Sequence, residues 1–373
     1  KLLAGRYPHV VYVAGNHDYY RSSLEEVEEI RRTLALNNVH WLENEIAEIE
    51  QRPLPFPPPG PPTPGPVTGR TGQIILQNRC MVDEQGPDCF LGASYFPLVW
   101  MVRHDVARGR LNLQWLRQRG VQFVRAFAEV GGSSWADRVI DPRTPDWKNQ
   151  LIEATTTARE LGLRAAWTVF AGGVLTKDYE WSQAIDIFIA AMRAYRTSLQ
   201  YVEIRNEANG PPDDIARAMA ARVWAQLGCV VAITGSPEAD LPAIYRDSRA
   251  NLLTFHPDRT RGERGYRTIR QIKHDLSGVP NAFVNNEPKG IQSSDDFTDI
   301  GDPVLLAAGA LTSWICGAAA YVLHHGAGIR AGGAADLNVG RMANCWDQPR
   351  LEPALALIAS AKARLPVDLP NWA

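Results

Sequence analysis

Cysteine is scarce in this sequence, and its few positions form no metal or redox motif. The five residues show no CxxC spacing, which argues against a structural zinc site; they are Cys80, Cys89, Cys229, Cys316 and Cys345. Cys80 and Cys89 flank a short predicted hairpin, so these two can form a disulfide. Two separate thiols are the alternative, and the spacing does not decide between them.

Other features are missing as well, and each absence removes a class of function. No run of apolar residues reaches the length of about 18–20 that a membrane span requires. The 39 basic and 41 acidic residues give a net charge of −2, so nothing calls for nucleic acid or an anionic membrane as a partner. There is no GxGxxG and no GxxxxGK[ST] motif, so nucleotide binding has no support and we predict no cofactor. No signal peptide is visible, which leaves the location open; a secreted or virion-associated protein is compatible with the sequence.

Proline is concentrated in one stretch, residues 51–71, where it alternates with glycine and other small residues. Such a stretch cannot join a helix or a sheet and favours extended polyproline II. We interpret it as a linker. It divides the 373 residues into a short part, 1–50, and a long part, 72–373.

The short part is predicted to be a βαβ fragment. Strands are expected at 10–14 and 39–42, with a helix at 24–36 between them. The turn after the first strand, Gly15-Asn16-His17-Asp18, resembles a metal-site motif of the calcineurin-like metallophosphoesterases. The resemblance implies that Asn16 binds metal and His17 contacts phosphate. The other metal-binding elements of that family are absent from residues 1–70, so we predict a partial domain without a working metal site.

The long part alternates apolar strand-like runs with amphipathic segments. Eight strands are expected, at 89–95, 121–127, 164–170, 201–205, 230–234, 252–256, 282–285 and 319–325. Helices are expected between and after them, at 111–119, 147–161, 181–196, 213–227, 268–275, 303–314 and 353–364. This pattern predicts a (β/α)8 TIM barrel preceded by a small hairpin. A doubly wound sheet is the rival fold, but it normally carries a glycine-rich phosphate loop.

Polar residues interrupt the predicted strands at their C-terminal ends, where barrel enzymes place their chemistry. Strand two ends near Arg125, and strand four ends at Asn206-Glu207. Strand seven repeats the amide and glutamate as Asn286-Glu287. Strands six and eight end in histidine, at His256, His324 and His325.

In this order and spacing, residues 85–365 resemble the clan A glycoside hydrolases, which include the family 5 cellulases and mannanases. The resemblance implies that Glu207 is the general acid/base and Glu287 the nucleophile. It also implies that Asn206 binds the sugar 2-hydroxyl and that Arg125 braces the nucleophile. The tryptophan that the family usually has after strand eight is not evident, and His324 and His325 stand there instead. The usual tyrosine near strands six and seven is also absent, with His256 as its substitute. We therefore predict that Asn286, His256 and His324 line the substrate site.

Glycosidic cleavage has its own requirement for two carboxyl groups. One is protonated and assists the leaving oxygen, and the other is ionised and attacks the anomeric carbon. In a retaining enzyme the two lie about 5–5.5 Å apart. We predict a monomeric retaining glycosidase that cleaves β-glycosidic bonds of a polysaccharide or oligosaccharide. A catalytically inactive carbohydrate-binding or structural barrel is the first alternative, and a truncated metallophosphoesterase is the second.

Tryptophan is abundant, with 11 residues. Large aromatic side chains either fill a core or provide flat surfaces on which sugar rings stack. Three of them lie near predicted loops or helix starts and are open to either role: Trp100, Trp135 and Trp181. The sequence does not identify the sugar or the linkage, nor whether cleavage occurs within a sugar chain or at its end.

Overall fold

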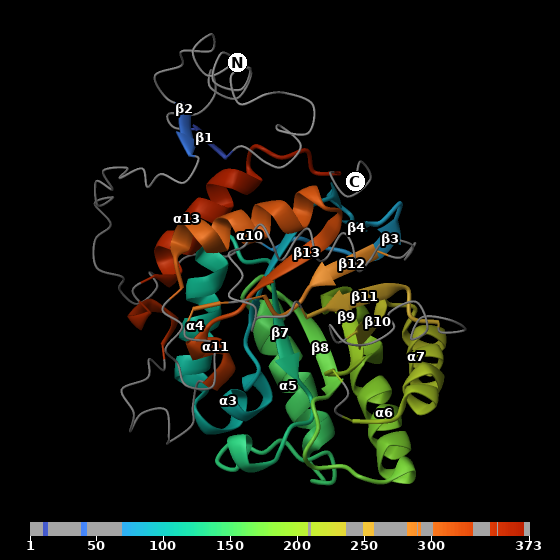
Figure 1. Cartoon of the computed structure of the whole chain (residues 1–373). Helices are drawn as coiled ribbons and strands as arrows, with labels where there is room; N and C mark the ends of the chain where they lie inside the picture. The colour runs from blue at the N-terminus through green and yellow to red at the C-terminus, as the bar shows by residue number, and fades with distance from the viewer. Residues whose placement is uncertain are drawn as a thin grey trace. The chain divides into compact units, whose positions relative to one another are not determined.

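The computed structural model divides the chain into two compact units, Lys1–Pro57 and Pro58–Ala373, and each is described by itself (Figure 1). The described residues are 10–13, 39–42, 69–207, 210–235, 249–256, 282–288, 290–291, 301–330, 344–348 and 350–368.

In the first unit, two short strands are described, β1 (Val10–Val13) and β2 (Val39–Leu42). They pair in parallel, with Val10 opposite Val39. Both strands are confirmed, and a parallel pair needs a crossover between its members, as the predicted βαβ order supplies. The helix expected at 24–36 and the candidate ligands Asn16 and His17 lie outside the described residues.

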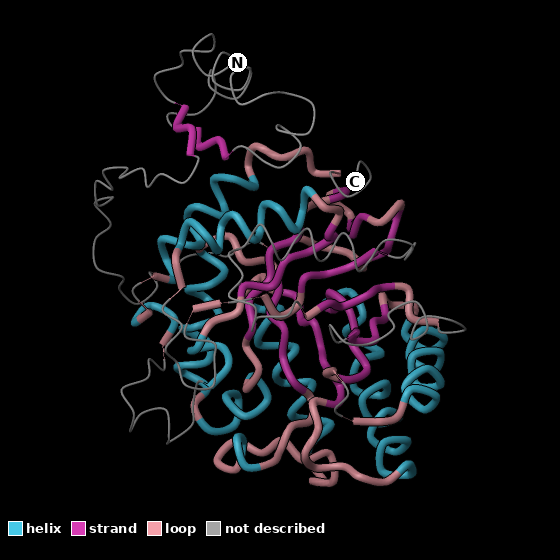
Figure 2. The backbone as a smooth tube through the Cα atoms, in the orientation of Figure 1, coloured by secondary structure: helices cyan, strands magenta, loops and turns pink. Residues whose placement is uncertain are grey.

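The second unit contains a closed barrel of eight parallel strands (Figures 1 and 2). In barrel order, starting from the first in the chain, they are β6 (Phe90–Ser94), β7 (Phe123–Phe127), β8 (Arg164–Phe170), β9 (Leu199–Arg205), β10 (Val231–Gly235), β11 (Leu252–Phe255), β12 (Ala282–Asn285) and β13 (Ala318–Leu323). Strand β13 pairs with β6 and closes the ring. The predicted (β/α)8 fold is confirmed, with every strand found within two residues of its expected bounds.

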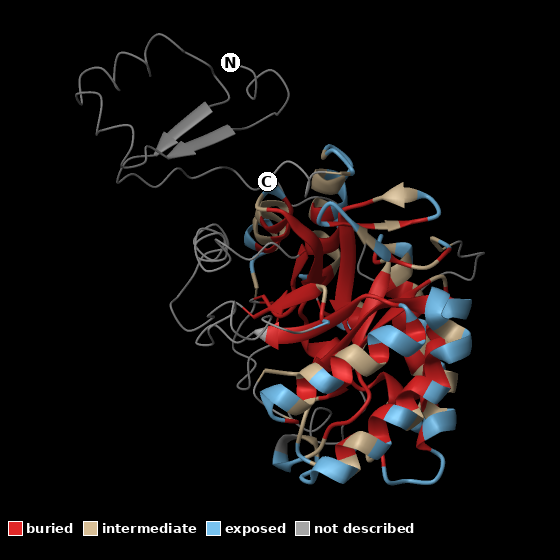
Figure 3. Ribbon diagram, turned by 90° about the vertical axis from the view of Figure 1, so that its right-hand side faces the viewer, coloured by how far each residue is buried: buried red, intermediate tan, exposed pale blue. Residues whose placement is uncertain are grey.

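Helices surround the barrel, with their exposed sides facing outward in Figure 3. The described ones are α3 (Leu98–His104), α4 (Val106–Gln118), α5 (Trp147–Glu160), α6 (Asp178–Met192), α7 (Asp213–Leu227), α10 (Pro303–Ile315), α11 (Gly326–Arg330) and α13 (Leu351–Lys362). Short 3₁₀ segments are η1 (Ser133–Trp135), η2 (Arg193–Ser198) and η3 (Cys345–Asp347). The helix predicted at 268–275 lies outside the described residues. Within the described ranges, none of the helices combines the length and apolar character that crossing a bilayer requires.

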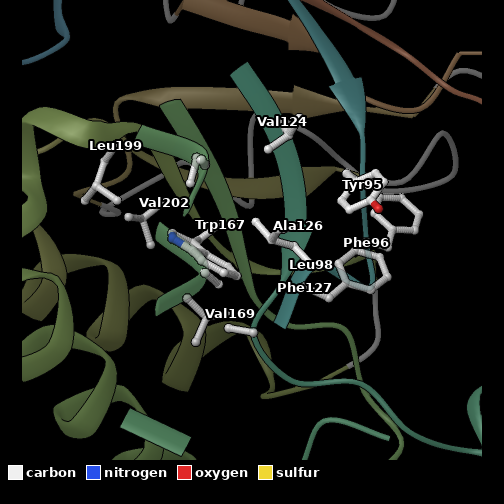
Figure 4. Packing of buried hydrophobic residues seen from close by; sticks show 14 of the residues in the cluster. Tyr95, Phe96, Leu98, Val124, Ala126, Phe127, Trp167, Val169, Leu199 and Val202 are labelled. Carbon is white, nitrogen blue, oxygen red and sulfur yellow. The ribbon is translucent and has the colours of Figure 1, made fainter. Parts of the chain in front are cut away.

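Alternating side chains build two separate cores. On β8 and β9, Trp167 and Val202 point outward to the helices, where they pack with residues of the neighbouring strands (Figure 4). Ala166 and Tyr201, one position earlier, belong to the core inside the barrel. This period of two is what strand geometry dictates, and it determines which side chains reach the barrel axis.

A three-stranded antiparallel sheet closes the N-terminal end of the barrel. It consists of β3 (Ile75–Gln77), β4 (Cys80–Asp83) and β5 (Gly86–Pro87). Ile74, directly before β3, and Met81 on β4 pack with the core inside the barrel. The predicted hairpin therefore has one more strand than expected, and it plugs the barrel.

Cys80 and Cys89 do not form the disulfide that their spacing allowed. Both are buried, and each thiol contacts a backbone carbonyl instead. Cys80 Sγ lies 3.7 Å from the oxygen of Asp368, and Cys89 Sγ lies 3.7 Å from that of Pro366. Separate thiols, the alternative, are what the fold contains.

Candidate active site

A layer of polar side chains lies inside the barrel, toward the C-terminal ends of the strands. Four consecutive strands each contribute one inward residue, and the exposed fraction of each is at most 1%. They are Arg125 on β7, Thr168 on β8, Glu203 on β9 and Thr234 on β10. Because polar groups buried without partners are costly, the hydrogen bonds within this layer determine its structure.

Glu203 is the centre of the layer. Its carboxylate accepts hydrogen bonds from Arg125 Nη2 at 2.7 Å and from Asn286 Nδ2 at 2.9 Å. The hydroxyls of Thr168 and Thr234 also contact it. Burial by itself raises the pKa of Glu203, but the charge of Arg125 and the hydrogen bonds outweigh burial and lower that pKa below its usual value. Glu203 is therefore held as a buried anion.

Arg125 connects this layer to the strand ends. Nη1 donates to Glu287 Oε1 at 2.5 Å, and Nη2 donates to Asn206 Oδ1 at 2.7 Å. Its guanidinium also lies 5.2 Å from the ring centre of Phe96 and 5.4 Å from that of Phe127. Burial lowers the pKa of Arg125, whereas the two carboxylates raise it by more, and the net shift is upward. The guanidinium is thus a fixed cation that contacts both Glu287 and Asn206.

Glu207 and Glu287, the two predicted catalytic carboxyls, face each other across His256. Nδ1 of His256 lies 3.1 Å from Glu207 Oε1, and its Nε2 lies 3.7 Å from Glu287 Oε1. One carboxylate oxygen of each glutamate and one imidazole nitrogen all lie within 4.8 Å of one another. The Glu207 side chain is 38% exposed and that of Glu287 is 8% exposed. Both carboxyls therefore belong to one small site, and Glu207 is its more accessible member.

The backbone at Glu207 is unusual, with φ at 52°. This left-handed conformation is uncommon for residues other than glycine, asparagine and aspartate. It occurs directly after β9, where Asn206 N donates to the carbonyl of Phe170.

Asn286 and His324 have partners other than substrate. Asn286 is fully buried; its Oδ1 accepts from the Tyr201 hydroxyl at 2.6 Å, and its Nδ2 donates to Glu203. His324 Nδ1 lies 2.7 Å from Ser94 Oγ, and its ring is tilted against Phe96 at 5.5 Å. The fold thus places Asn286 below the two carboxyls and His324 beside Phe96.

His325 and the three tryptophans that were open to either role lie outside the pair of carboxyls. His325 is buried and lies 3.1 Å from Gln348 Oε1. Trp100 stacks on His104 at 4.4 Å, and Trp181 is 8% exposed in the core. Only Trp135, which lies 5.8 Å from Phe127, continues the aromatic surface that begins beside Arg125.

A divalent metal ion would find its donors in the same place. Zinc binds carboxylate oxygen and imidazole nitrogen at about 2.0–2.2 Å, so two donors on one ion lie at most about 4.4 Å apart. The donors of Glu207, His256 and Glu287 span up to 4.8 Å. They would have to close by a few tenths of an ångström to share a zinc ion.

The central residue of the site, Glu203, was not predicted from the sequence. It lies in the middle of an apolar strand rather than at its end. The alternation of side chains along a strand could have revealed it, because Tyr201 and Glu203 are two positions apart and share the inner face. Thr168, within β8, was missed for the same reason.

Comparison with known proteins places the fold but not the substrate. No protein-family model matches the chain, and no curated protein matches its sequence. Among solved structures, an exo-β-1,4-mannosidase from Opitutaceae bacterium strain TAV5 superposes with a TM-score of 0.56 at 14% identity, over 78% of this chain and 63% of that one. A family 5 mannosidase from Rhizomucor miehei gives 0.54 at 11% identity, over 81% of this chain and 100% of the other. A β-mannanase from Thermomonospora fusca gives 0.53 at 12% identity, over 78% and 97%.

These identities are low, so the likeness concerns the fold alone. The long part of the chain is a (β/α)8 barrel, as its sequence pattern predicts, and it shares this fold with the two mannosidases and the mannanase. This chain spans about two thirds of the length of the exo-mannosidase. The resemblance of residues 1–50 to metallophosphoesterases stays a prediction.

Proposed function

We propose that the chain is a retaining glycoside hydrolase acting on β-linked oligosaccharides or polysaccharides. The observation that supports this most directly is the separation of the Glu207 and Glu287 carboxylate oxygens, at most 4.8 Å. Retaining enzymes place their carboxyl groups about 5–5.5 Å apart, whereas inverting enzymes need about 6.5–9.5 Å to admit a water molecule.

In the first step, a carboxylate oxygen of Glu287 attacks the anomeric carbon of the bound sugar. The glycosidic C–O bond breaks, its electron pair goes to the leaving oxygen, and the proton of Glu207 is transferred to that oxygen. In the second step, Glu207 takes a proton from water while the water oxygen attacks the anomeric carbon. The bond to Glu287 breaks, and both glutamates return to their starting states.

Arg125 serves this chemistry by keeping Glu287 ionised and oriented. It does not reach substrate, because it is fully buried. It also orients Asn206: since Asn206 Oδ1 accepts from Arg125, the amide NH₂ remains to donate to a sugar hydroxyl. Glu203 binds Arg125 directly, and Asn286 donates to Glu203.

The mannosidases and the mannanase that share the fold suggest where to look for substrate. We infer that β-mannosides and β-glucosides should be tested first, as activated aryl glycosides and as oligosaccharides. The first product should have the β configuration when the anomers are followed by ¹H NMR, because double displacement retains configuration.

The deciding variant is Glu287→Ala. It should lose hydrolysis of the activated glycoside by at least about a thousandfold, since loss of a nucleophile removes the covalent route. Azide should restore part of the turnover by occupying the space of the missing carboxylate and forming a glycosyl azide. Glu160→Ala, at a half-exposed carboxylate at the end of α5, is the matched control and should behave as wild type.

Two outcomes would contradict the proposal. If Glu287→Ala retains full activity, Glu287 is not the nucleophile. If the wild-type chain binds glycans but hydrolyses none of a broad panel, the barrel is a carbohydrate-binding module that has lost catalysis.

A further inference from the structure

A pocket lies at the opposite end of the barrel from Glu207 and Glu287. It has a volume of about 220 Å³. The segments around it are the residues that precede β3 and the turns that lead into β8 and β9. Three arginines and three hydroxyl residues supply its polar lining: Arg70, Arg159, Arg164, Thr71, Thr197 and Ser198. No Asp or Glu is among the described residues that line it.

Arg164 is the buried member of this lining, with an exposed fraction of 3%. Its Nη2 atom donates to three oxygens, namely the carbonyls of Thr71 at 2.8 Å and Gly72 at 3.0 Å and the Asp83 carboxylate at 2.9 Å. Its Nε and Nη1 atoms are buried and have no hydrogen-bond partner among the described residues. Buried arginine donors are normally paired, so this guanidinium lacks acceptors.

Local charge is also unbalanced. The Asp83 carboxylate is shared, because it binds Arg70 at 2.6 Å as well as Arg164. Arg159 contributes a third cation, whose guanidinium lies 5.3 Å from the ring of Tyr195. Arg70 also lies 3.5 Å from the Asp88 carboxylate, which Lys362 binds at 2.9 Å. The carboxylates of Asp83 and Asp88 are thus shared among Arg70, Arg164 and Lys362, and Arg159 adds further positive charge beside the pocket.

We propose that this pocket is a binding site for a small tetrahedral oxyanion, a phosphate or sulfate group. Such a group offers several acceptor oxygens, and guanidinium groups are the side chains best suited to it. The volume equals about seven water molecules at roughly 30 Å³ each, which accommodates the group with part of its hydration shell. The group can be the free inorganic ion or the phosphate of a larger molecule that projects from the pocket.

The test is calorimetric titration of the full chain with inorganic phosphate at constant ionic strength. Binding should be saturable, and Arg159→Gln should weaken it at least about tenfold by removing one cation from the rim. Arg159 is exposed, so this variant should fold even if a change at Arg164 does not. Arg196→Gln is the control, because Arg196 is exposed on η2 nearby but does not line the pocket; it should bind phosphate as wild type does.

Further titrations identify the molecule that carries the oxyanion and exclude a general effect of salt. Tighter binding of a sugar phosphate than of inorganic phosphate would assign the site to a phosphorylated ligand, and equal binding would assign it to the free ion. Either result supports the oxyanion site. Absence of saturable binding, an equal loss in both arginine variants, or equal effects of chloride and phosphate would overturn it. Glu287→Ala should bind phosphate normally, so the result does not depend on glycosidase activity.

Discussion

Glu203 and Glu287 bind the same guanidinium, although they come from strands that are not neighbours in the barrel. Arg125 donates to Glu287 through Nη1 and to Glu203 through Nη2 and Nε. A cation that interacts with two carboxylates stabilises the ionised form of each one less than it would stabilise a single partner. Glu203 therefore fixes the orientation of Arg125 and also moderates its influence on the proposed nucleophile. We regard Glu203 as a positioning residue.

Replacing Glu203 by glutamine tests this relationship. Glu203→Gln keeps the shape but removes the charge, so Arg125 acts on Glu287 alone and lowers its pKa. We expect kcat to fall by about 10²-fold and the acid limb of the kcat/KM profile to move to lower pH by about one unit. The measurement is a pH–rate profile with an activated aryl glycoside.

Thr254→Val is the control for this variant. Thr254, on the next strand β11, is also buried, but it donates to Thr234 at 3.1 Å rather than to the charged groups. Its replacement should leave the acid limb in place. An unchanged acid limb in Glu203→Gln would mean that Glu203 has only a structural role.

Glu207→Gln should show a dependence on the leaving group. A substrate with a poor leaving group needs the proton of Glu207 and should lose about 10²–10⁴-fold in rate. An activated aryl glycoside needs no proton and should lose much less in its first step. The two substrates act as controls for each other in steady-state and burst kinetics. An equal loss on both would remove Glu207 from the role of acid.

Acid should destabilise the fold through His325. Burial lowers the pKa of His325 to about 4, whereas the unfolded chain has a histidine pKa near 6.5. Between these values the unfolded state binds more protons, so stability falls as the pH drops from about 6.5 to 4. The difference of about 2.5 units corresponds to roughly 3 kcal/mol.

Denaturant unfolding at several pH values measures this effect. His325→Gln should unfold with a flatter pH dependence than the wild type over this window. His104→Gln, at an exposed position on α3, is the control and should keep the wild-type slope. The same slope in His325→Gln and wild type would argue against a buried neutral histidine.

Two glycines offer a matched pair for the packing around the site. A Cβ at Gly328 would lie 1.7 Å from the carbonyl oxygen of Ser94, and the Gly328 carbonyl itself accepts from Phe96 N at 2.7 Å. Gly328→Ala should therefore cost at least about 1–3 kcal/mol. In the middle of α10, a Cβ at Gly309 meets only the hydroxyl of Tyr321, at 3.7 Å, so Gly309→Ala should gain about 0.5–1 kcal/mol. Chemical unfolding of both variants checks the two signs, and a neutral Gly328→Ala would show that this junction can relax.

The bounds of the helices were predictable from the sequence where the residues at both ends favoured the same start and stop. Helix α7 has its expected bounds because acidic residues begin it and Gly228, with φ at 61°, ends it. Helix α4 begins five residues earlier than expected, because the Asp105 side chain accepts from Arg108 N and starts the helix in a polar stretch. Such a cap becomes decisive only when tertiary packing supports it.

The site was predictable from the sequence only where polar residues stand at or near the ends of the predicted strands. Arg125, Asn206, Glu207 and Glu287 were predicted because polar residues at strand ends mark the functional face, and the fold brings these four together. Glu203 was missed because a charged residue in the middle of a strand shows neither its face nor its partners. Those partners, on β7, β8, β10 and after β12, become neighbours only when the barrel closes.

The left-handed backbone at Glu207 has an evolutionary meaning. A non-glycine residue with this φ costs of order 1 kcal/mol or more, so glycine or asparagine at position 207 would give a more stable chain. Stability alone therefore favours losing the glutamate, and the proposed catalytic role of its carboxyl would account for its presence. Thermal stability that rises in Glu207→Asn, with activity lost, would reveal the conflict between folding and function that this one position carries.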